Sequence, residues 1–358
     1  MNFFNKDKKT ALEAKDLAQF IAFGPVVFQV AKVMRDKGIL EVIEKSGSAG
    51  LTHQEIVEQT KLPDYGVRVL LESSLGIGLV IIDDEQKYRI TKTGYFILHD
   101  QLTKVNMDFV QDVCYKGLFH LQESIETGKP AGLRELGNWP TVYEGLSQLP
   151  PHIQKSWFAF DHFFSDIAFP IVIKEVYKDG IKNILDIGGN TGKWASLSVK
   201  HSDDIHVTIM DLPGQATMAK KRIEEMGLSG RVSFFPTNIL DETQPFPKGF
   251  DAIWMSQFLD CFSEKEIVSI LKRCADAIDD NGYVLILEAF WDRQRFETAA
   301  FCLQQTSIYF TAIANGNSQM YDSRVFNKCI YEAGFEIVEE KDGIGLSHTL
   351  LKCKKIKK

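Results

Sequence analysis

The second half of the chain alternates between two kinds of segment, and this alternation limits the folds open to it. Short apolar runs rich in β-forming residues are separated by stretches with helical periodicity; the runs are "IKNILDIGG", "IHVTIMDLPG", "RVSFFPTNIL", "FDAIWMSQFLD" and "GYVLILEAF". Strands that alternate with helices form a parallel sheet covered on both faces. The sequence from Ile181 onward therefore predicts a doubly wound α/β domain, to which "FNKCIYEAGFEIVEE" and "SHTLLKCKK" add a helix and edge strands.

The first part of the chain has a different pattern. Residues 17–45 and 67–80 carry apolar side chains at helical spacing, and residues 51–80 predict two helices joined by a short turn. Thr52 and Glu55 form a capping box at the start of the first of these. "LVIIDDEQKYRITKTG" then predicts two short strands around a turn. Two helices followed by a hairpin are typical of a winged helix.

A winged helix can bind DNA, but the charges of this one disfavour it. Its recognition helix, about residues 64–75, carries Arg68 but also Asp64 and Glu72, and the whole chain has a net charge of −7. We expect no nucleic acid and no membrane as partners, and a homodimer formed through the apolar helices of the N-terminal domain. A winged-helix regulator remains the alternative from a different functional class.

The length of 358 residues exceeds what a single core usually supports. We predict three parts: a winged-helix dimerisation domain (1–105), a helical bridge (106–170) and the sheet domain (171–358). The six cysteines are scattered without metal-ligand spacing, so we expect neither a disulfide framework nor a metal. The N-terminus lacks the features of a signal peptide, which predicts a cytoplasmic protein.

The glycine-rich turn after "NILDI" lies where such sheets bind ligands. Gly188, Gly189 and Gly192 are spaced almost as in a dinucleotide-binding turn, but Asn190 stands where that turn needs its middle glycine. Asp186 would also repel a diphosphate. NAD is therefore a poor fit.

S-adenosylmethionine has no phosphate and carries an ammonium and a sulfonium. Asp186 then becomes a favourable Coulombic partner, and Asn190 is acceptable because asparagine tolerates a positive φ. Asp211 ends the next strand, where an acid can accept the ribose hydroxyls of an adenosine. These residues together predict S-adenosylmethionine as the cofactor.

Four motifs extend this prediction: "LDIGGNTG", "IMDLPG", "FLDCFSEKEIVSILKRCADAI" and "GYVLILEAF". With them the chain resembles the small-molecule O-methyltransferase family typified by caffeate and hydroxyindole O-methyltransferases. The resemblance covers most of the chain and implies a winged-helix dimerisation domain followed by a class I (Rossmann-like) methyltransferase domain. It also implies methyl transfer to a hydroxyl of a small, aromatic molecule.

The resemblance assigns cofactor contacts position by position. Gly188, Gly189 and Gly192 would lie against the cofactor, and Asp211 would hold the ribose. Leu212 would contact the adenine, and Asn238 and Ile239 stand where the family has a pair that flanks it. Ser256 stands where the family has a lysine near the cofactor.

The chain departs from the family at the catalytic base. "LDCFSEKE" places Asp260 where the family has its catalytic histidine, and Met320 stands where the family often has a glutamate that orients this histidine. Asp260 is the candidate base for the acceptor proton. The loss of both family residues keeps other outcomes open, namely N-, S- or C-methylation, another cofactor-assisted reaction, or a regulator that senses S-adenosylmethionine.

The segment "SWFAFDHFFSDIAF" is rich in aromatic residues and predicts part of the acceptor pocket. Taken one by one, its aromatic side chains fit a core better than a pocket, although part of this face should reach the substrate, and His162 could be satisfied within a packed helix. The predicted acceptor residues are Trp157, Phe158, Asp161, His162, Phe163, Trp291 and Met320.

Overall fold

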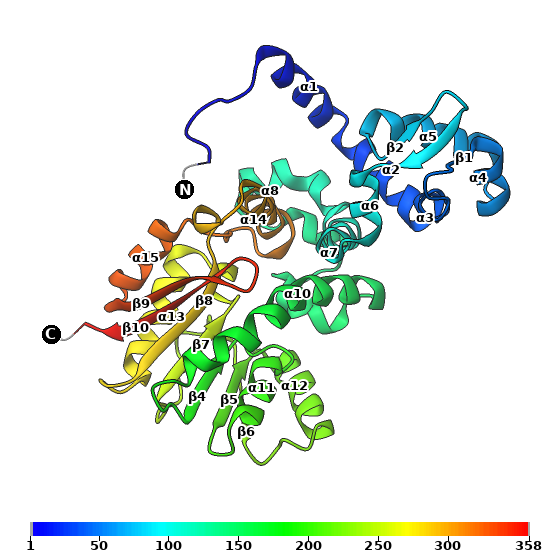
Figure 1. Cartoon of the computed structure of the whole chain (residues 1–358). Helices are drawn as coiled ribbons and strands as arrows, with labels where there is room; N and C mark the ends of the chain where they lie inside the picture. The colour runs from blue at the N-terminus through cyan, green and yellow to red at the C-terminus, as the bar shows by residue number, and fades with distance from the viewer. Residues whose placement is uncertain (1–2, 357–358) are drawn as a thin grey trace. The chain divides into compact units, whose positions relative to one another are not determined.

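The computed structural model describes residues 3–356 and contains two compact units, one spanning Phe4–Val110 and the other beginning at Gln111. The N-terminal unit has a small antiparallel sheet in the order β1-β3-β2 (Figure 1). Its elements are α1 (Ala11–Ala22), α2 (Gly24–Asp36), α3 (Ile39–Lys45), β1 (Leu51–Thr52), α4 (His53–Thr60), α5 (Asp64–Ile77), β2 (Val80–Ile82), β3 (Lys87–Ile90), α6 (Lys92–His99) and α7 (Gln101–Phe109).

Helices α3 to α5 and the β2–β3 hairpin form the predicted winged helix around a small apolar core. The Thr52 hydroxyl accepts a hydrogen bond from the Glu55 amide, and the Thr52 amide donates to the Glu55 carboxylate at 2.8 Å, so the predicted capping box is present. In the hairpin turn, the Asp83 carboxylate accepts the Lys87 amide at 2.9 Å. The predicted helical region 17–45 is divided into three helices, because Gly24–Pro25 and the left-handed Gly38 interrupt it.

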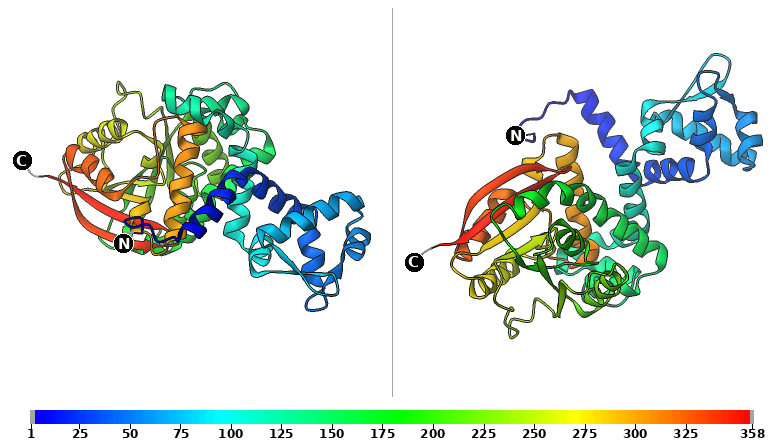
Figure 2. Two further views of the ribbon diagram at one scale, coloured as in Figure 1. Left: turned by 90° about the horizontal axis from the view of Figure 1, so that it is seen from above. Right: turned by 60° about the horizontal axis from the view of Figure 1, so that its bottom comes forward.

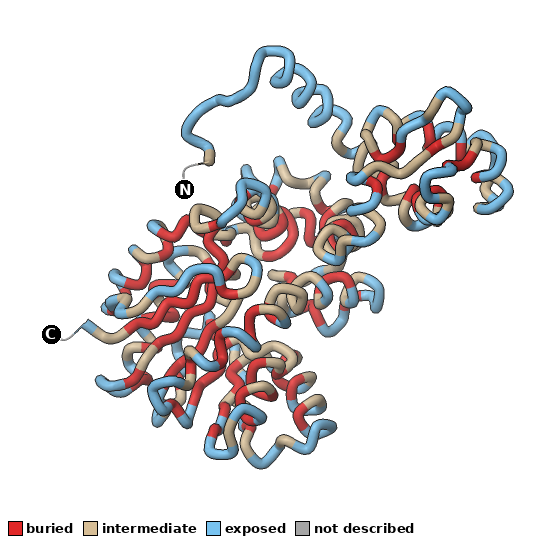
Figure 3. The backbone as a smooth tube through the Cα atoms, in the orientation of Figure 1, coloured by how far each residue is buried: buried red, intermediate tan, exposed pale blue. Residues whose placement is uncertain are grey.

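Helix α1 stands apart from this core, because none of its residues is buried within the chain (Figure 3). A capping box between Thr10 and Glu13 starts the helix. Large apolar side chains nevertheless remain exposed on it, including Leu12, Phe20 and Ile21. Among the described residues no single helix has the length and apolarity to cross a membrane; α1 and α2, bent by 68°, reach these limits only as a pair.

The second unit is built on a seven-stranded sheet in the order β6-β5-β4-β7-β8-β10-β9. The first five strands are parallel, and β10 runs antiparallel to both β8 and β9. The predicted runs all form strands: β4 (Asn183–Ile187), β5 (His206–Asp211), β6 (Val232–Pro236), β7 (Ala252–Ser256), β8 (Tyr283–Ala289), β9 (Phe335–Ile344) and β10 (His348–Lys355). Of the two predicted edge strands, β9 lies at the edge, whereas the prediction was wrong for β10, which pairs with β8 and β9 on its two sides.

Helices cover both faces of this sheet (Figures 1 and 2). Along β4, Ile184 packs into one core and Leu185 into the other, as expected of a strand buried on both sides. The first core contains residues of α10 (Pro151–Val176), α11 (Lys193–His201) and α12 (Pro213–Glu225), and the second those of α13 (Glu264–Ala277) and α15 (Ser323–Glu332). This is the predicted doubly wound, class I methyltransferase architecture.

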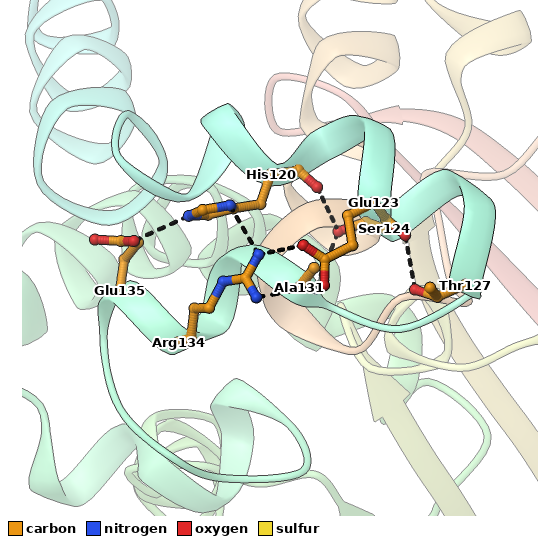
Figure 4. A network of polar contacts seen from close by, with 7 residues as sticks. All are labelled: His120, Glu123, Ser124, Thr127, Ala131, Arg134 and Glu135. Carbon is orange, nitrogen blue, oxygen red and sulfur yellow. Dashed lines mark hydrogen bonds and ion pairs between the residues drawn. The ribbon is translucent and has the colours of Figure 1, made fainter.

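The segment between Gln111 and α10 belongs to the same compact unit as the sheet, so the three-part division of the chain remains a proposal. Its helical turns include η2 (Gly117–His120), α8 (Leu121–Thr127) and η3 (Ala131–Glu135). In Figure 4, Arg134 reaches Glu123 and His120, and His120 contacts Glu135 at 2.9 Å. These partly exposed ion pairs tie the turns together, although each contributes little stability alone.

Candidate functional site: a cavity at the glycine turn

The glycine turn after β4 can be made only with small residues at two positions. Gly188 has φ +75°, and a Cβ there would lie 2.1 Å from the ring of Phe258. A Cβ at Gly189 would lie 2.8 Å from the Asp186 carboxylate. Asn190 has φ +48°, the left-handed conformation that the sequence indicated for it. The two glycines therefore let the turn pack closely against Phe258 and Asp186.

Asp211, at the end of β5, holds this turn in place. Its two carboxylate oxygens accept the backbone amides of Asn190 and Leu212, each at 2.7 Å. Burial raises the pKa of Asp211 to about 6, although both hydrogen bonds oppose the rise. Asp211, the acid expected to contact a ribose, thus also fixes the backbone of the glycine turn at Asn190 and its own backbone at Leu212.

Asp186 is buried at the end of β4, with only 2% of its surface exposed. Burial raises its pKa well above the usual range, and the nearby charge of Asp211 adds to the effect. One carboxylate oxygen has no hydrogen-bond partner among the residues that the structure describes. A buried acid with a free oxygen is costly unless a ligand or cation completes it.

A cavity of about 50 Å³ lies beside Asp186. Two predicted acceptor residues from α10 line it and contact the turn, since the Asn190 side-chain amide donates to Asp161 at 3.2 Å and His162 lies 3.4 Å from the Thr191 hydroxyl. The lining residues are Asp161, His162, Ser165, Phe169, Asp186, Gly188, Gly189, Asn190, Thr191, Lys193, Trp194, Trp254, Ser256 and Gln257.

Two of the lining residues are tryptophans that form a stacked pair. The rings of Trp194 and Trp254 lie 4.2 Å apart at an interplanar angle of 16°, and both side chains are buried. Phe169 packs edge-on against Trp194 at 5.2 Å. The cavity therefore has a rigid aromatic wall next to its acids.

The polar atoms around the cavity match a ligand that carries hydrogen-bond donors and positive charge. Within residues 3–356, buried oxygens of Asp186, Asn190, Ser256 and Gln257 have no partner. All four residues line the cavity. A cationic methionyl group of S-adenosylmethionine would satisfy several of these acceptors, whereas a diphosphate would meet the carboxylates of Asp186 and Asp161.

The predicted adenine contacts lie outside this cavity. Asn238 is exposed, and its side-chain oxygen accepts the Leu240 amide at 3.0 Å. Ile239 is buried in the core, and its carbonyl accepts from Arg273. Leu212 is half-buried at the start of α12, next to Asp211. The role of these three residues stays a prediction.

Asp260 lies in a short helical turn, η5 (Leu259–Cys261), just after β7. Its side chain is buried, and burial raises its pKa to about 6. The Cys261 thiol donates to the carboxylate at 3.4 Å. A carboxylate with this raised pKa accepts a proton more readily than an ordinary aspartate, and it is still ionised at neutral pH.

Glu288 was missed by the sequence analysis. It is fully buried in β8, and one of its carboxylate oxygens accepts the amides of Phe258 at 3.0 Å and Leu259 at 2.8 Å. Burial, with the Asp260 charge second, raises its pKa well above the usual range. Glu288 therefore fixes the loop that carries Asp260. The lone acid inside the apolar run "GYVLILEAF" is the signal that could have revealed it.

The remaining predicted acceptor residues do not line the cavity at the turn. The Trp157 indole donates to the Tyr309 hydroxyl of α14 (Glu297–Tyr309) at 2.8 Å, and Phe158 packs edge-on against Trp157. Phe163 contacts the ring of Phe164. The Met320 amide donates to Ser307, and the Trp291 amide to the Tyr321 carbonyl. Their part in binding an acceptor remains a prediction.

Titration of the buried acids should affect stability. Burial raises the pKa of Asp161 to about 7, against about 3.9 in an unfolded chain. Its folded form therefore binds more protons than the unfolded form between pH 4 and 7, so its contribution to stability falls as pH rises through this window. We expect Asp161→Asn to stabilise the ligand-free protein at pH 8 but not at pH 4.

A quarter of the Asp161 side chain is exposed, so solvent screening limits the gain at pH 8 to about 1 kcal/mol. Urea unfolding of the wild type and the variant at both pH values measures the difference. Asp166→Asn, a change of a mostly exposed acid on the same helix, should show no such gain. Equal effects of Asp161→Asn at the two pH values would contradict the linkage.

Comparison with known proteins agrees with this geometry. Two family models match the chain, the Dimerisation2-like domain over residues 15–88 and the O-methyltransferase domain over residues 160–336. The L-tyrosine C(3)-methyltransferase of Streptomyces lavendulae is 24% identical over 91% of this chain and 88% of its own length. The 2,7-dihydroxy-5-methyl-1-naphthoate 7-O-methyltransferase of Streptomyces carzinostaticus is 26% identical over 74% and 77%.

Among solved structures, that of the S-adenosylmethionine-dependent methyltransferase SibL in its apo form superimposes with a TM-score of 0.71. It is 25% identical and covers 95% of this chain and 99% of its own. The matched family models cover most of the N-terminal unit and the parallel strands of the sheet with the glycine turn. The chain belongs to the family of S-adenosylmethionine-dependent small-molecule O-methyltransferases that carry an N-terminal dimerisation domain.

Proposed function

We propose that the chain binds S-adenosylmethionine at the glycine turn and catalyses methyl transfer to a hydroxyl of a small aromatic molecule. The observation that carries the proposal is the buried carboxylate of Asp186, whose free oxygen belongs to the cavity lining. When bound, the cofactor supplies an electrophilic methyl group on a sulfonium. The chain's own residues bind it, exclude water and handle the acceptor proton.

In this proposal different residues bind different parts of the cofactor. Asp186 and Ser256 serve the methionyl end, and Gly188, Gly189 and Gly192 let it approach the backbone. Asp211 accepts the ribose hydroxyls. The adenine contacts are those inferred from the family resemblance, namely Leu212, Asn238 and Ile239.

Asp260 is the proposed general base, and Glu288 its positioning residue. As the acceptor oxygen forms its new bond to carbon, its proton passes to the Asp260 carboxylate. The raised pKa of Asp260, about 6, suits it to this transfer near neutral pH. Because Glu288 accepts two amides of the same loop, it holds Asp260 in place without contacting the acceptor.

We place the acceptor pocket next to the residues of α10 that contact the glycine turn, because the ring of Phe158 lies 5.4 Å from the ring of His162. Trp157 is anchored to α14 by its bond to Tyr309, and Phe158 packs beside it. Phe163, Trp291 and Met320 complete the proposed wall. An aromatic wall of this kind favours a flat, apolar acceptor.

A second candidate is methylation of a ring carbon next to a phenolic hydroxyl. It is favoured by the relative that methylates carbon 3 of L-tyrosine and matches 91% of this chain. In that reaction the ring carbon forms the new bond, and the ring then loses the proton of that carbon to a base. Phenols with deuterium on the ring distinguish the outcomes, because only carbon methylation removes a deuterium from the product.

The first experiment is calorimetric titration with S-adenosylmethionine and, separately, with NAD, followed by mass spectrometry of products from a series of phenols. We expect binding of S-adenosylmethionine only, and methylated products that keep their ring deuterium. Failure to bind S-adenosylmethionine would contradict the proposed function. Loss of one ring deuterium would replace oxygen by carbon as the acceptor atom.

We also propose a homodimer, with α1 as part of its interface. A twelve-residue helix with no buried residue within its own chain is marginal in water by itself, and Leu12, Phe20 and Ile21 expose apolar surface that a second copy could cover.

We expect the wild type to sediment as a dimer and Phe20→Asp/Ile21→Asp to sediment as a monomer. The matched change Lys15→Asp/Asp16→Lys, at other exposed sites of α1, should leave the dimer intact, and a dimeric Phe20/Ile21 variant would contradict the interface.

A further inference from the structure

The cavity at the glycine turn is rich in acids, but the ligand proposed for it is not purely cationic. The methionyl group of S-adenosylmethionine carries a carboxylate beside its ammonium. Asp161 and Asp186 can meet the ammonium, yet both repel the carboxylate. Some group in the lining must therefore supply positive charge.

Lys193 is the cationic residue in that lining. It is the first residue of α11, directly after Gly192, and only 19% of its side chain is exposed. Its ammonium pairs with the carboxylate of Asp166 on α10. The side chain thus lies between the two helices that border the cavity, and the Asp166 carboxylate holds its ammonium in position.

Two nearby basic residues are weaker candidates. Burial, and then the charge of Lys193, lowers the pKa of His162 to about 4, so its imidazole is neutral at pH 7. Arg222 donates to the Thr191 hydroxyl at 3.2 Å, but it is not part of the cavity lining. Among these three residues, Lys193 is the one that both lines the cavity and carries a positive charge.

Asp166 shows how a ligand carboxylate could bind. More than half of its side chain, 58%, is exposed, and an ion pair with such an exposed acid contributes little and exchanges readily. A ligand carboxylate in the cavity could therefore displace it from Lys193 at little cost. The first turn of α11 adds to this, since its N-cap, Gly192, offers no side-chain acceptor for the helix amides.

We propose that Lys193 binds the carboxylate of the cofactor's methionyl group and so makes the site selective for a ligand with both an ammonium and a carboxylate. The inference rests on the proposed function, because it takes S-adenosylmethionine as the ligand. It assigns Lys193 to binding and gives it no part in the proton transfer. Asp186, with its free buried oxygen, faces the ammonium.

Calorimetric titration with S-adenosylmethionine and with its decarboxylated analogue, which keeps the amine, tests the assignment. We expect the wild type to bind S-adenosylmethionine about tenfold or more tightly than the analogue, as one charge-assisted hydrogen bond implies. Lys193→Met should weaken binding of S-adenosylmethionine by the same factor and leave the affinity for the analogue near that of the wild type. Lys193→Arg should restore most of the preference.

Arg222→Met is the matched control, because it removes a cation close to the turn but outside the cavity lining, and it should keep the wild-type preference. Wild-type binding of S-adenosylmethionine with an unchanged preference in Lys193→Met would overturn this assignment alone, and so would equal weakening of both ligands in that variant. No binding of either ligand by the wild type would overturn the proposed function, and the assignment with it.

Discussion

Gly188→Ala should abolish measurable binding of S-adenosylmethionine. The new Cβ would lie 2.1 Å from the Phe258 ring, and Gly188 has φ +75°. A side chain in that conformation costs about 1 to 2 kcal/mol, and forcing the Phe258 ring aside costs about 1 to 3 kcal/mol more. Because Phe258 is itself part of the loop that Glu288 holds, its displacement would also move Asp260. Calorimetric titration measures the binding, and urea unfolding measures the stability.

Gly180→Ala is the control for backbone strain. Gly180 has φ +77°, but a Cβ there meets no atom within 4 Å. We expect this variant to lose about 1 kcal/mol of stability and to bind S-adenosylmethionine like the wild type. Equal binding by Gly188→Ala would show that the turn does not need its bare backbone.

Asp260→Asn should lower kcat by about 10² to 10⁴ fold, the usual contribution of a general base. The wild type should lose activity as pH falls through about 6, because the raised pKa of Asp260 lies there and its protonated form cannot accept the acceptor's proton. The acidic limb of kcat that is due to residue 260 should be absent from the variant, since asparagine at this position does not titrate. Turnover between pH 5 and 8, with a phenol identified in the acceptor screen, measures both effects.

Binding of S-adenosylmethionine by the same variant shows whether the site is intact, and we expect it to be unchanged. Cys261→Ala serves as the control within the same turn. Because the hydrogen bond from the thiol lowers the pKa of Asp260, this variant should keep most of the turnover and an acidic limb that lies at higher pH. An Asp260→Asn variant with wild-type turnover at every pH would show that the acceptor loses its proton to another group.

Local patterns in the sequence predicted most of the helices and strands of the fold. The strand-like runs are almost continuously apolar because the parallel strands are buried on both faces, and the capping box of Thr52 and Glu55 depends on residues three positions apart. The left-handed Asn190 also followed from local preference. These features depend on neighbours in the chain, which is why they could be predicted from it.

The site could be predicted only in part, because it depends on contacts between distant elements. The sequence analysis grouped Asp161 and His162 with the acceptor residues, and it did not reveal that both line the cavity at the glycine turn. Helix α10 is apolar on several sides and buries residues along its whole length, so its periodicity does not reveal which side faces which ligand. Glu288 was hidden for a similar reason, since its partners are amides of a loop about 30 residues away.

The stacked pair of Trp194 and Trp254 gives the protein an optical property. Two of its five tryptophans line the cavity that we assign to the cofactor, and their rings are coupled at 4.2 Å. A cation or an adenosine placed beside them would change the electric field at the indoles. We therefore expect the tryptophan emission of the unlabelled protein to change when a ligand occupies the cavity.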